Sequence, residues 1–127
     1  MRLFAILFIL FAVSGTALKS NSYEFGRSSF SASMWIKGGE LFTDVESVEI
    51  EMTDAGAFAL EVYDSSNRLV SRGDRPNPRG GWSTFNFRSG MAPLVFSGKF
   101  KLKLVNHEAG TRHIKQGIVN CSSCGAE

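Results

Sequence analysis

The sequence predicts an all-β fold, an antiparallel β-sandwich of the jelly-roll kind with about seven or eight short strands. Apolar and polar residues alternate with a period of two along several short segments, which is typical of half-buried strands. Residues that favour turns separate these segments, and no segment shows a helical period. No internal repeat or low-complexity tract is present, so a single sandwich accounts for the whole pattern.

The alternating segments define the core that we expect. The residues predicted to face it, segment by segment, are Phe30, Ala32, Met34 and Ile36; Val48, Ile50 and Met52; Phe58, Leu60 and Val62; Phe85 and Phe87; Phe100, Leu102 and Leu104; Ile114 and Ile118. Burying each large apolar side chain contributes roughly 1.5–3 kcal/mol before the loss of entropy is subtracted. The polar residues between them, such as Glu49 and Glu51, are expected on the solvent side.

Turn residues mark where one strand ends and the next begins. They lie at residues 38–39, 54–56, 64–67 and 106–110. Residues 54–56, Asp-Ala-Gly, predict a hairpin turn between two alternating segments. The longest predicted loop covers residues 73–81, because Pro76 and Pro78 cannot donate hydrogen bonds to a strand ladder.

The first 17 residues have the pattern of a secretory signal peptide. Arg2 precedes an apolar run over residues 3–13, and the small residues Gly15 and Ala17 suit a cleavage site after Ala17. The run is short for a membrane span, so an uncleaved anchor is the less favoured alternative. We therefore expect residues 18–127 to form one secreted domain with a short cysteine-containing tail, not integrated into a membrane.

Charge is distributed unevenly along the chain, although the formal net charge is only +2. Residues 40–64 hold eight acidic residues and no Lys or Arg, whereas residues 68–115 hold ten basic residues and two acidic ones. Neighbouring strands can neutralise this difference across a sheet, which we favour. The alternative is a segregated basic face for an anionic partner.

The two cysteines, Cys121 and Cys124, lie close together near the C-terminus. In a secreted protein this spacing favours a local disulfide, or pairing with another chain, over redox catalysis, which requires a helix after the first cysteine. A zinc site with His107 and His113 is a further alternative, although the spacing matches no familiar finger. Asn120 begins an Asn-Cys-Ser sequon and is a candidate for N-glycosylation.

Residues 33–119 resemble a galectin in the order and spacing of several segments. These are MWIKGGELFTDVESVEIEM, TDAGAFALEVYDSSNRLVS, a glycine-rich connection leading to Trp82, and MAPLVFSGKFKLKLV. The resemblance implies a sandwich that binds β-galactosides through three consecutive segments. Galectins carry His-x-Asn-x-Arg, Val-x-Asn and Trp-Gly-x-Glu-x-Arg there, whereas residues 61–65 of this chain are Glu-Val-Tyr-Asp-Ser and residues 70–72 are Val-Ser-Arg. In the third segment only Trp82 matches, which implies altered or weakened galactoside specificity.

Trp82 is the leading candidate for ligand contact, because an indole ring can stack on a pyranose and the preceding loop is rich in glycine. Glu61, Tyr63, Arg72 and Arg88 are predicted to surround it and to supply the hydrogen bonds that orient a hydroxylated ligand. The alternative is that Trp82 is a core residue at the edge of a strand.

A second candidate surface is the basic series Lys99, Lys101 and Lys103 along one strand. These residues could bind sulfated glycans or anionic lipid, or they could pair with the Glu49 and Glu51 face in a purely structural role.

The pattern as a whole predicts a secreted, non-enzymatic binding module whose main partner is a carbohydrate or glycoprotein. No arrangement of a nucleophile with a base is visible, no cofactor or metal is predicted, and nucleic-acid binding is not expected. The alternatives are a protein-binding or defence module that has lost sugar binding, and a binder of anionic surfaces through the basic strand.

Overall fold

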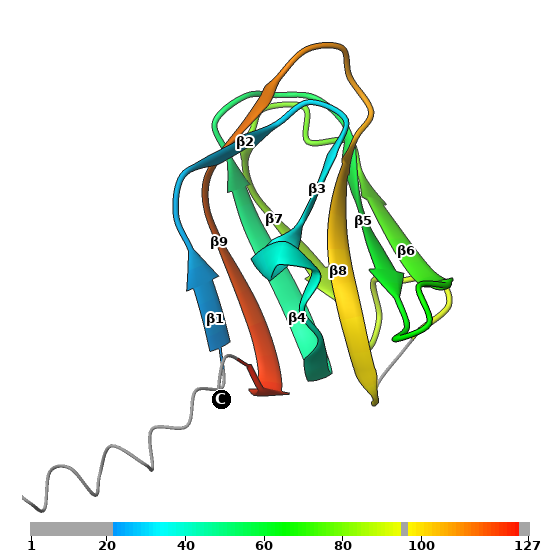
Figure 1. Cartoon of the computed structure of the whole chain (residues 1–127). Coiled ribbons are helices and arrows are strands. Elements are labelled where there is room, and N and C mark those ends of the chain that lie inside the picture. Colours follow the sequence, from blue (N-terminus) through cyan, green and yellow to red (C-terminus); the bar gives the residue numbers. More distant parts are fainter. Residues whose placement is uncertain (1–21, 95–96, 125–127) are drawn as a thin grey trace, which may run out of the picture.

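The computed structural model describes residues 22–94 and 97–124, and it confirms an antiparallel β-sandwich (Figure 1). The predicted signal peptide lies outside the described residues. Within the described part of the chain there are nine strands, slightly more than expected. The difference arises because a strand at Ser22–Phe25 was not expected and because the segment around Phe30 to Ile36 is divided into two strands. Ala32, between those two, is exposed and not in the core as predicted.

The strands form two layers, which we call sheet A and sheet B. Sheet A contains β1 (Ser22–Phe25), β2 (Ser28–Phe30), β4 (Phe42–Met52), β7 (Gly81–Asn86) and β9 (Arg112–Ser123). Its order is β1 and β2 together, then β9, β4 and β7. Sheet B has the order β3 (Ser33–Trp35), β8 (Lys99–Asn106), β5 (Phe58–Tyr63) and β6 (Leu69–Arg75).

The two sheets are connected at one end of the sandwich. There Phe42 and Thr43 of β4 pair with Phe100 and Lys99 of β8. The short 3-10 helix η1 (Ile36–Gly39) follows β3 and includes left-handed backbone at Lys37 and Gly38. Because η1 precedes β4, it carries the chain from sheet B back to sheet A (Figure 1).

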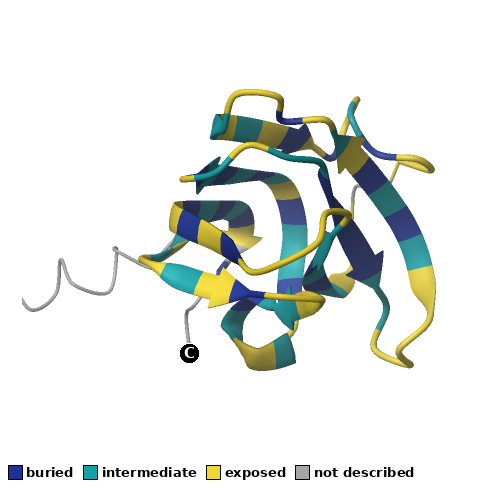
Figure 2. Cartoon of the chain, turned by 90° about the horizontal axis from the view of Figure 1, so that it is seen from above, coloured by how far each residue is buried: buried dark blue, intermediate teal, exposed yellow. Residues whose placement is uncertain are grey.

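The core lies between the inner faces of the two sheets. Buried and exposed bands alternate along the strands, as the period of two predicts (Figure 2). Phe58, Phe85 and Phe87 are fully buried, and Phe100 packs against the core from a half-buried position. The rings of Phe58 in sheet B and Phe85 in sheet A meet edge to face, with their centroids 5.6 Å apart, which joins the two layers.

The connections between strands agree only in part with those expected. Residues 54–56 do form a turn, but β4 and β5 belong to different sheets, so the predicted hairpin is wrong. The hairpin at residues 64–67 is confirmed, because Tyr63 of β5 pairs with Leu69 of β6. The predicted loop at residues 73–81 is shorter, since β6 continues to Arg75 and β7 begins at Gly81.

Arg112 is a buried charge, although alternation placed the basic residues of this region on solvent faces. Its guanidinium donates hydrogen bonds to the backbone oxygens of Gly56 and Ala57 and to the Asn106 side chain. The Arg112 Nε also lies 3.7 Å from an Asp54 carboxylate oxygen. Arg112 therefore fixes the turn that passes from sheet A to sheet B.

Candidate functional site

The outer face of sheet B carries a hydrogen-bonded group that we call the sheet B network: Glu61, Tyr63, Arg72, Asp74 and His107. Glu61 accepts a hydrogen bond of 2.6 Å from the Tyr63 hydroxyl and one of 2.8 Å from Arg72. Arg72 also donates to Asp74 and lies 2.9 Å from the His107 Nε2. The pairing of β5 with β6 places Glu61 directly opposite Arg72, which brings these side chains together.

Hydrogen bonds and charges within this network shift the pKa values of several of its members. The hydrogen bond from Tyr63 to Glu61, assisted by burial and by the negative charge, raises the pKa of Tyr63 to about 12. Hydrogen bonds from Arg72, and then from His107, outweigh burial and hold the pKa of Asp74 below its usual value. Pairing with Asp74 also raises the pKa of Arg72. The ionised forms of Asp74 and Arg72 are therefore favoured in the folded protein.

Aromatic rings extend the network toward β3. The Trp35 and Tyr63 rings meet in a T-shape at 5.2 Å, and the Lys103 Nζ lies 5.0 Å from the Trp35 centroid and 5.5 Å from that of Tyr63. Lys103 therefore stabilises both rings through a cation–π contact. A ring already covered by an ammonium group offers little surface for stacking on a sugar.

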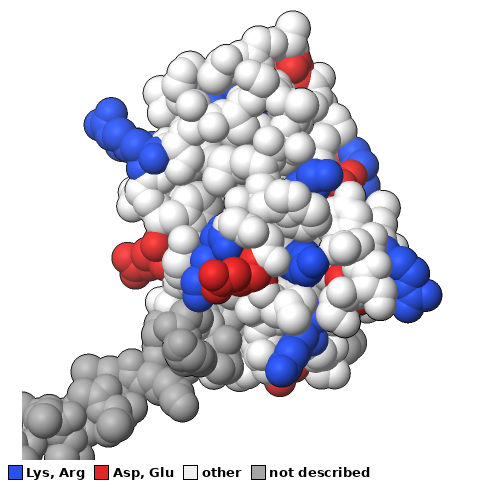
Figure 3. Space-filling model, in the orientation of Figure 1, with Lys and Arg blue, Asp and Glu red and all other residues white. Residues whose placement is uncertain are grey.

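The basic series of β8 is divided among separate contacts. Lys103 contacts the two rings, Lys101 donates to the Asn67 side chain at 2.7 Å, and Lys99 is exposed. Figure 3 shows basic and acidic side chains interspersed over this side of the molecule. The Glu49 and Glu51 face lies on sheet A, so the structural pairing predicted for these lysines with it does not form.

Acidic and basic segments of the chain meet across neighbouring strands and turns. Three of the ion pairs join Glu61 with Arg72, Asp64 with Arg68, and Asp54 with Arg112. Each pair takes its acid from residues 40–64 and its base from residues 68–115. Local neutralisation therefore explains much of the charge asymmetry in the sequence.

Trp82 lies on the opposite side of the sandwich from Glu61, Tyr63 and Arg72, three of the four residues predicted to surround it. It belongs to β7, which pairs with β4 in sheet A and not with β6. Arg88 follows the far end of β7, in a turn where its backbone nitrogen donates to the Asn86 side chain. Of the predicted site, the structure brings together Glu61, Tyr63 and Arg72 but separates them from Trp82. The adjacency of three segments implied by the galectin resemblance is therefore wrong.

Trp82 is 48% exposed, so it is not the core residue that was the alternative interpretation. It is the cross-strand partner of Glu51, and the two side chains lie on the outer face of sheet A. Glu51 accepts a hydrogen bond of 2.8 Å from Gln116 of β9. A row of three side chains that can contact a ligand therefore crosses β7, β4 and β9.

A hollow of about 660 Å³ adjoins this row at Glu51, and Gly81 beside Trp82 also lines it, although Trp82 itself does not. We call it the Trp82 hollow because of this adjacency. It is bounded by the ends of four strands and the connection between β1 and β2. Its lining residues are Arg27, Ser28, Ser29, Glu51, Met52, Thr53, Gly81, His113, Ile114 and Lys115. The volume is within the range of small-molecule sites, and the lining combines apolar surface with several hydrogen-bonding groups.

His113 is held at the rim of the hollow by Asp54. Its backbone nitrogen and its Nδ1 lie 3.1 Å and 3.0 Å from the Asp54 carboxylate oxygens. Burial alone would raise the pKa of Asp54, but the bonds from His113 and the charge of Arg112 outweigh it and lower the pKa. With Asp54 ionised, Nδ1 is the donor in this hydrogen bond, and Nε2 is left for a contact with a ligand.

Sequence reasoning missed most of this hollow. Arg27, Glu51, His113 and Lys115 belong to no motif, and they come from three separate parts of the chain. Glu51 was recognised only as a solvent-facing residue, and His113 only as a possible zinc ligand. The one signal in the sequence was Trp82 after two glycines, which correctly marked an exposed aromatic residue.

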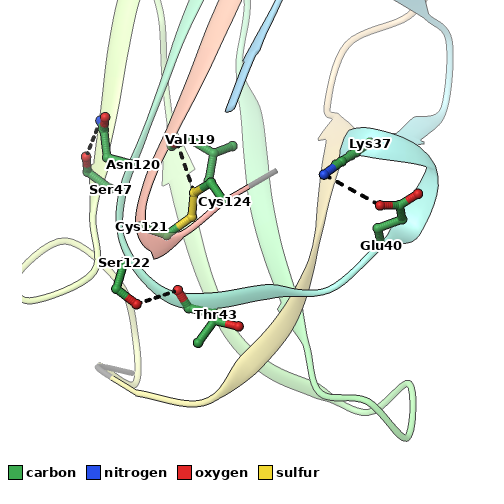
Figure 4. Close-up of a disulfide and its surroundings, with 9 residues drawn as sticks. All are labelled: Lys37, Glu40, Thr43, Ser47, Val119, Asn120, Cys121, Ser122 and Cys124. Atoms are coloured by element: carbon green, nitrogen blue, oxygen red, sulfur yellow. Dashed lines mark hydrogen bonds and ion pairs between the residues drawn. A yellow bond between two sulfur atoms is a disulfide. The ribbon is translucent and has the colours of Figure 1, made fainter. Parts of the chain in front are cut away.

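Cys121 and Cys124 form a disulfide with their Cα atoms 5.6 Å apart (Figure 4). Both are buried, so the disulfide fastens the tail after β9 against the core. A zinc site with these cysteines is therefore wrong, and His107 and His113 are bonded to Asp74 and Asp54 respectively. No cluster of potential metal ligands occurs among the residues that the structure describes.

Asn120 of the sequon lies on the outer face of sheet A. Its amide nitrogen donates to Ser47 and Glu49 at 3.0 and 3.1 Å. Figure 4 shows it directed toward Ser47, away from the disulfide. Attachment of a glycan to this nitrogen would require at least one of these bonds to break. No helix in the described ranges is long and apolar enough to span a membrane.

Comparison with known proteins gives a fold but no family. No family model matches the chain, and no curated protein matches its sequence. A fucose-binding module from Streptococcus pneumoniae has a TM-score of 0.51 at 17% identity, covering 76% of this chain and 70% of that one. FlgD from Xanthomonas campestris, described in connection with hook capping in flagellar assembly, has a TM-score of 0.50 at 16% identity, covering 84% of this chain and 75% of that one.

Proposed function

We propose that this protein is a non-enzymatic carbohydrate-binding module and that the Trp82 hollow holds the sugar. The observation that carries the proposal is the exposed indole of Trp82 beside a hollow lined with hydrogen-bonding side chains. A pyranose offers an apolar face for stacking and hydroxyl groups for hydrogen bonds, which matches this combination.

The shape of the site also supports this assignment. Glu51 is pre-positioned by Gln116, and His113 by Asp54, so both present oriented polar atoms without a large entropy cost on binding. The similarity in fold to a fucose-binding module is compatible with the assignment. Because the galectin-type segments do not share one face, we expect affinity for β-galactosides to be weak.

We further propose that the domain acts outside the cell. The disulfide between Cys121 and Cys124 suits an oxidising compartment. The pattern of residues 1–17 supports export, with cleavage after Ala17 leaving the mature domain. Its partners would then be free glycans or the glycan chains of glycoproteins.

A glycan array on the oxidised protein beginning at Leu18 tests the assignment. We expect selective hits whose affinity falls about two- to tenfold in the Trp82→Ala variant, because loss of one stacked ring corresponds to about 0.5–1.5 kcal/mol. Leu69→Ala is the matched control, since Leu69 is a similarly exposed apolar residue on sheet B. An array without hits from folded protein would overturn the assignment and direct the search to protein partners.

A further inference from the structure

Arg27 and Lys115 stand directly opposite each other between β9 and its neighbours β1 and β2. Phe25 pairs with Gly117 and Ser28 pairs with Ile114, so two residues on each side lie between these pairs. Continuing this register places Arg27 across from Lys115. The strand pairing is interrupted there, and both side chains are exposed on the surface.

Two like charges placed opposite each other on adjacent strands destabilise a sheet. Neither Arg27 nor Lys115 makes a hydrogen bond or an ion pair with its side chain in the part of the chain that the structure describes. Most other basic side chains do have such contacts: Arg72 bonds Glu61, Arg112 bonds backbone oxygens, and Lys101 bonds Asn67. The Arg27–Lys115 pair is therefore a local cost to the fold that an anion between the two would relieve.

The pair also lies where two hollows meet. Arg27 and Lys115 line the Trp82 hollow, and both also line a second hollow of about 440 Å³ that continues along β1 and β9. A chain-like ligand that extends from one hollow into the other therefore passes the two basic groups.

Acidic side chains stand on both sides of this pair. Glu51 lines the first hollow and Glu24 lines the second. Asp54 contributes a further negative charge next to His113 at the rim. These carboxylates can accept hydrogen bonds from sugar hydroxyl groups, but they repel further negative charge on a ligand.

We propose that the ligand is an acidic saccharide in which one carboxylate, that of a uronic acid residue, binds between Arg27 and Lys115. The inference rests on the proposed carbohydrate-binding function and names its ligand class. Neutral hydroxylated residues of the same chain occupy the hollows on either side, next to Trp82 and Glu24. The acidic flanks exclude a densely sulfated chain, which would place charge against Glu51 and Glu24.

Matched oligosaccharides separate the role of the carboxylate from the rest of the sugar. Hexasaccharides of hyaluronan and of glucuronoxylan are each compared with their carboxyl-reduced, neutral counterparts, and a heparin hexasaccharide represents dense charge. We expect at least one acidic chain to bind about tenfold more tightly than its reduced form and more tightly than heparin, because charge-assisted hydrogen bonds are the stronger ones.

The double variant Arg27→Gln, Lys115→Gln is expected to bind the acidic and the reduced chain within about twofold of each other. The control Arg79→Gln, Lys99→Gln removes the same charge at two exposed positions that do not line the hollow, and it should keep the full preference. Circular dichroism and a thermal melt confirm that each variant is folded.

Equal binding of acidic and reduced chains by the wild type would overturn the inference, as would a preference that survives in the double variant. Tightest binding to heparin would overturn it too. If the array shows neutral glycans that depend on Trp82 but neither acidic chain binds, the inference fails and the proposed function stands. If no glycan binds to folded protein, both fail.

Discussion

The outer faces of the two sheets use the same kinds of side chain in different ways. On sheet B, Glu61, Tyr63 and Arg72 bind one another, and Lys103 covers the Trp35 ring. On sheet A, Trp82 is half exposed, and Arg27 and Lys115 have no side-chain partner among the described residues. The comparison teaches that a cluster of polar and aromatic residues indicates a binding site only where its hydrogen-bonding groups and ring faces are not already occupied by other parts of the protein.

The largest change in stability is expected from a substitution at the centre of the sheet B network. Glu61→Ala removes the acceptor for both Tyr63 and Arg72, while the Glu61 side chain is only 12% exposed. We expect a loss of at least about 2 kcal/mol in the free energy of unfolding, because both hydrogen bonds to the ionised Glu61 carboxylate disappear and both are charge-assisted. Urea denaturation measures it, and Glu46→Ala on the exposed surface of β4 is the control.

The same Glu61→Ala variant should keep its glycan binding once it is folded. A sheet A site has no contact with Glu61, so the array pattern should match that of the wild type. Loss of the hits in folded Glu61→Ala, together with their retention in Trp82→Ala, would move the site to sheet B.

A smaller effect is expected from Tyr63→Phe, which removes one hydrogen bond and leaves the ring in place. We expect a cost of about 1 kcal/mol at neutral pH. Because the folded pKa of Tyr63 is raised to about 12, this stabilisation is complete below the unfolded value near 10 and is lost as the pH rises through about 12. Ultraviolet titration of tyrosinate should show a transition near pH 12 in the wild type that is absent from Tyr63→Phe. If the transition remained in the variant, it could not be assigned to Tyr63.

The pairing of Asp54 with His113 is expected to have a still smaller effect on stability, and this effect is lost at acidic pH. The pKa of Asp54 is lowered in the folded state, so its stabilising contribution is present above the unfolded value and is lost as the pH falls through the folded value. Stability of the wild type should therefore fall more steeply below about pH 4 than that of Asp54→Asn. Equal slopes in denaturation measured across this range would contradict the pairing.

The smallest expected change in stability is at Trp82 itself. Its exposed position at an edge strand predicts that Trp82→Ala changes the free energy of unfolding by no more than about 0.5 kcal/mol. A thermal melt with and without denaturant measures this change. A loss as large as that of Glu61→Ala would mean that Trp82 supports the fold, and reduced binding in the variant would then have a structural cause.

The alternation of residues made the fold class predictable, because a period of two shows which side of a strand is buried. It placed Val48, Ile50 and Met52 correctly in the core, with Glu49 and Glu51 facing outward. Alternation does not show which strand pairs with which. The turn at residues 54–56 has the residues of a hairpin, yet it joins different sheets. Long-range contacts hold it in place, among them the hydrogen bonds from Arg112 and the bond between Gly56 and Asn77.

The candidate site was less predictable for the same reason. The segments around Glu61, Arg72 and Trp82 follow one another in the chain, and we expected them to be neighbours in one sheet. Instead β7 pairs with β4, since Phe85 contributes to the core from the sheet A side. Arg27 and Lys115 are distant in sequence, so only the register of β9 against β1 and β2 reveals that they are opposite.

The most direct test of the central claim is to map a bound glycan onto the two faces. Amide chemical shifts of the labelled protein, titrated with the strongest array hit, identify the residues that contact it. We predict perturbations at Glu51, Trp82, His113 and Lys115, with the amides of Glu61 and Arg72 unchanged. Perturbations confined to β5 and β6 would contradict the claim and place the sugar on sheet B.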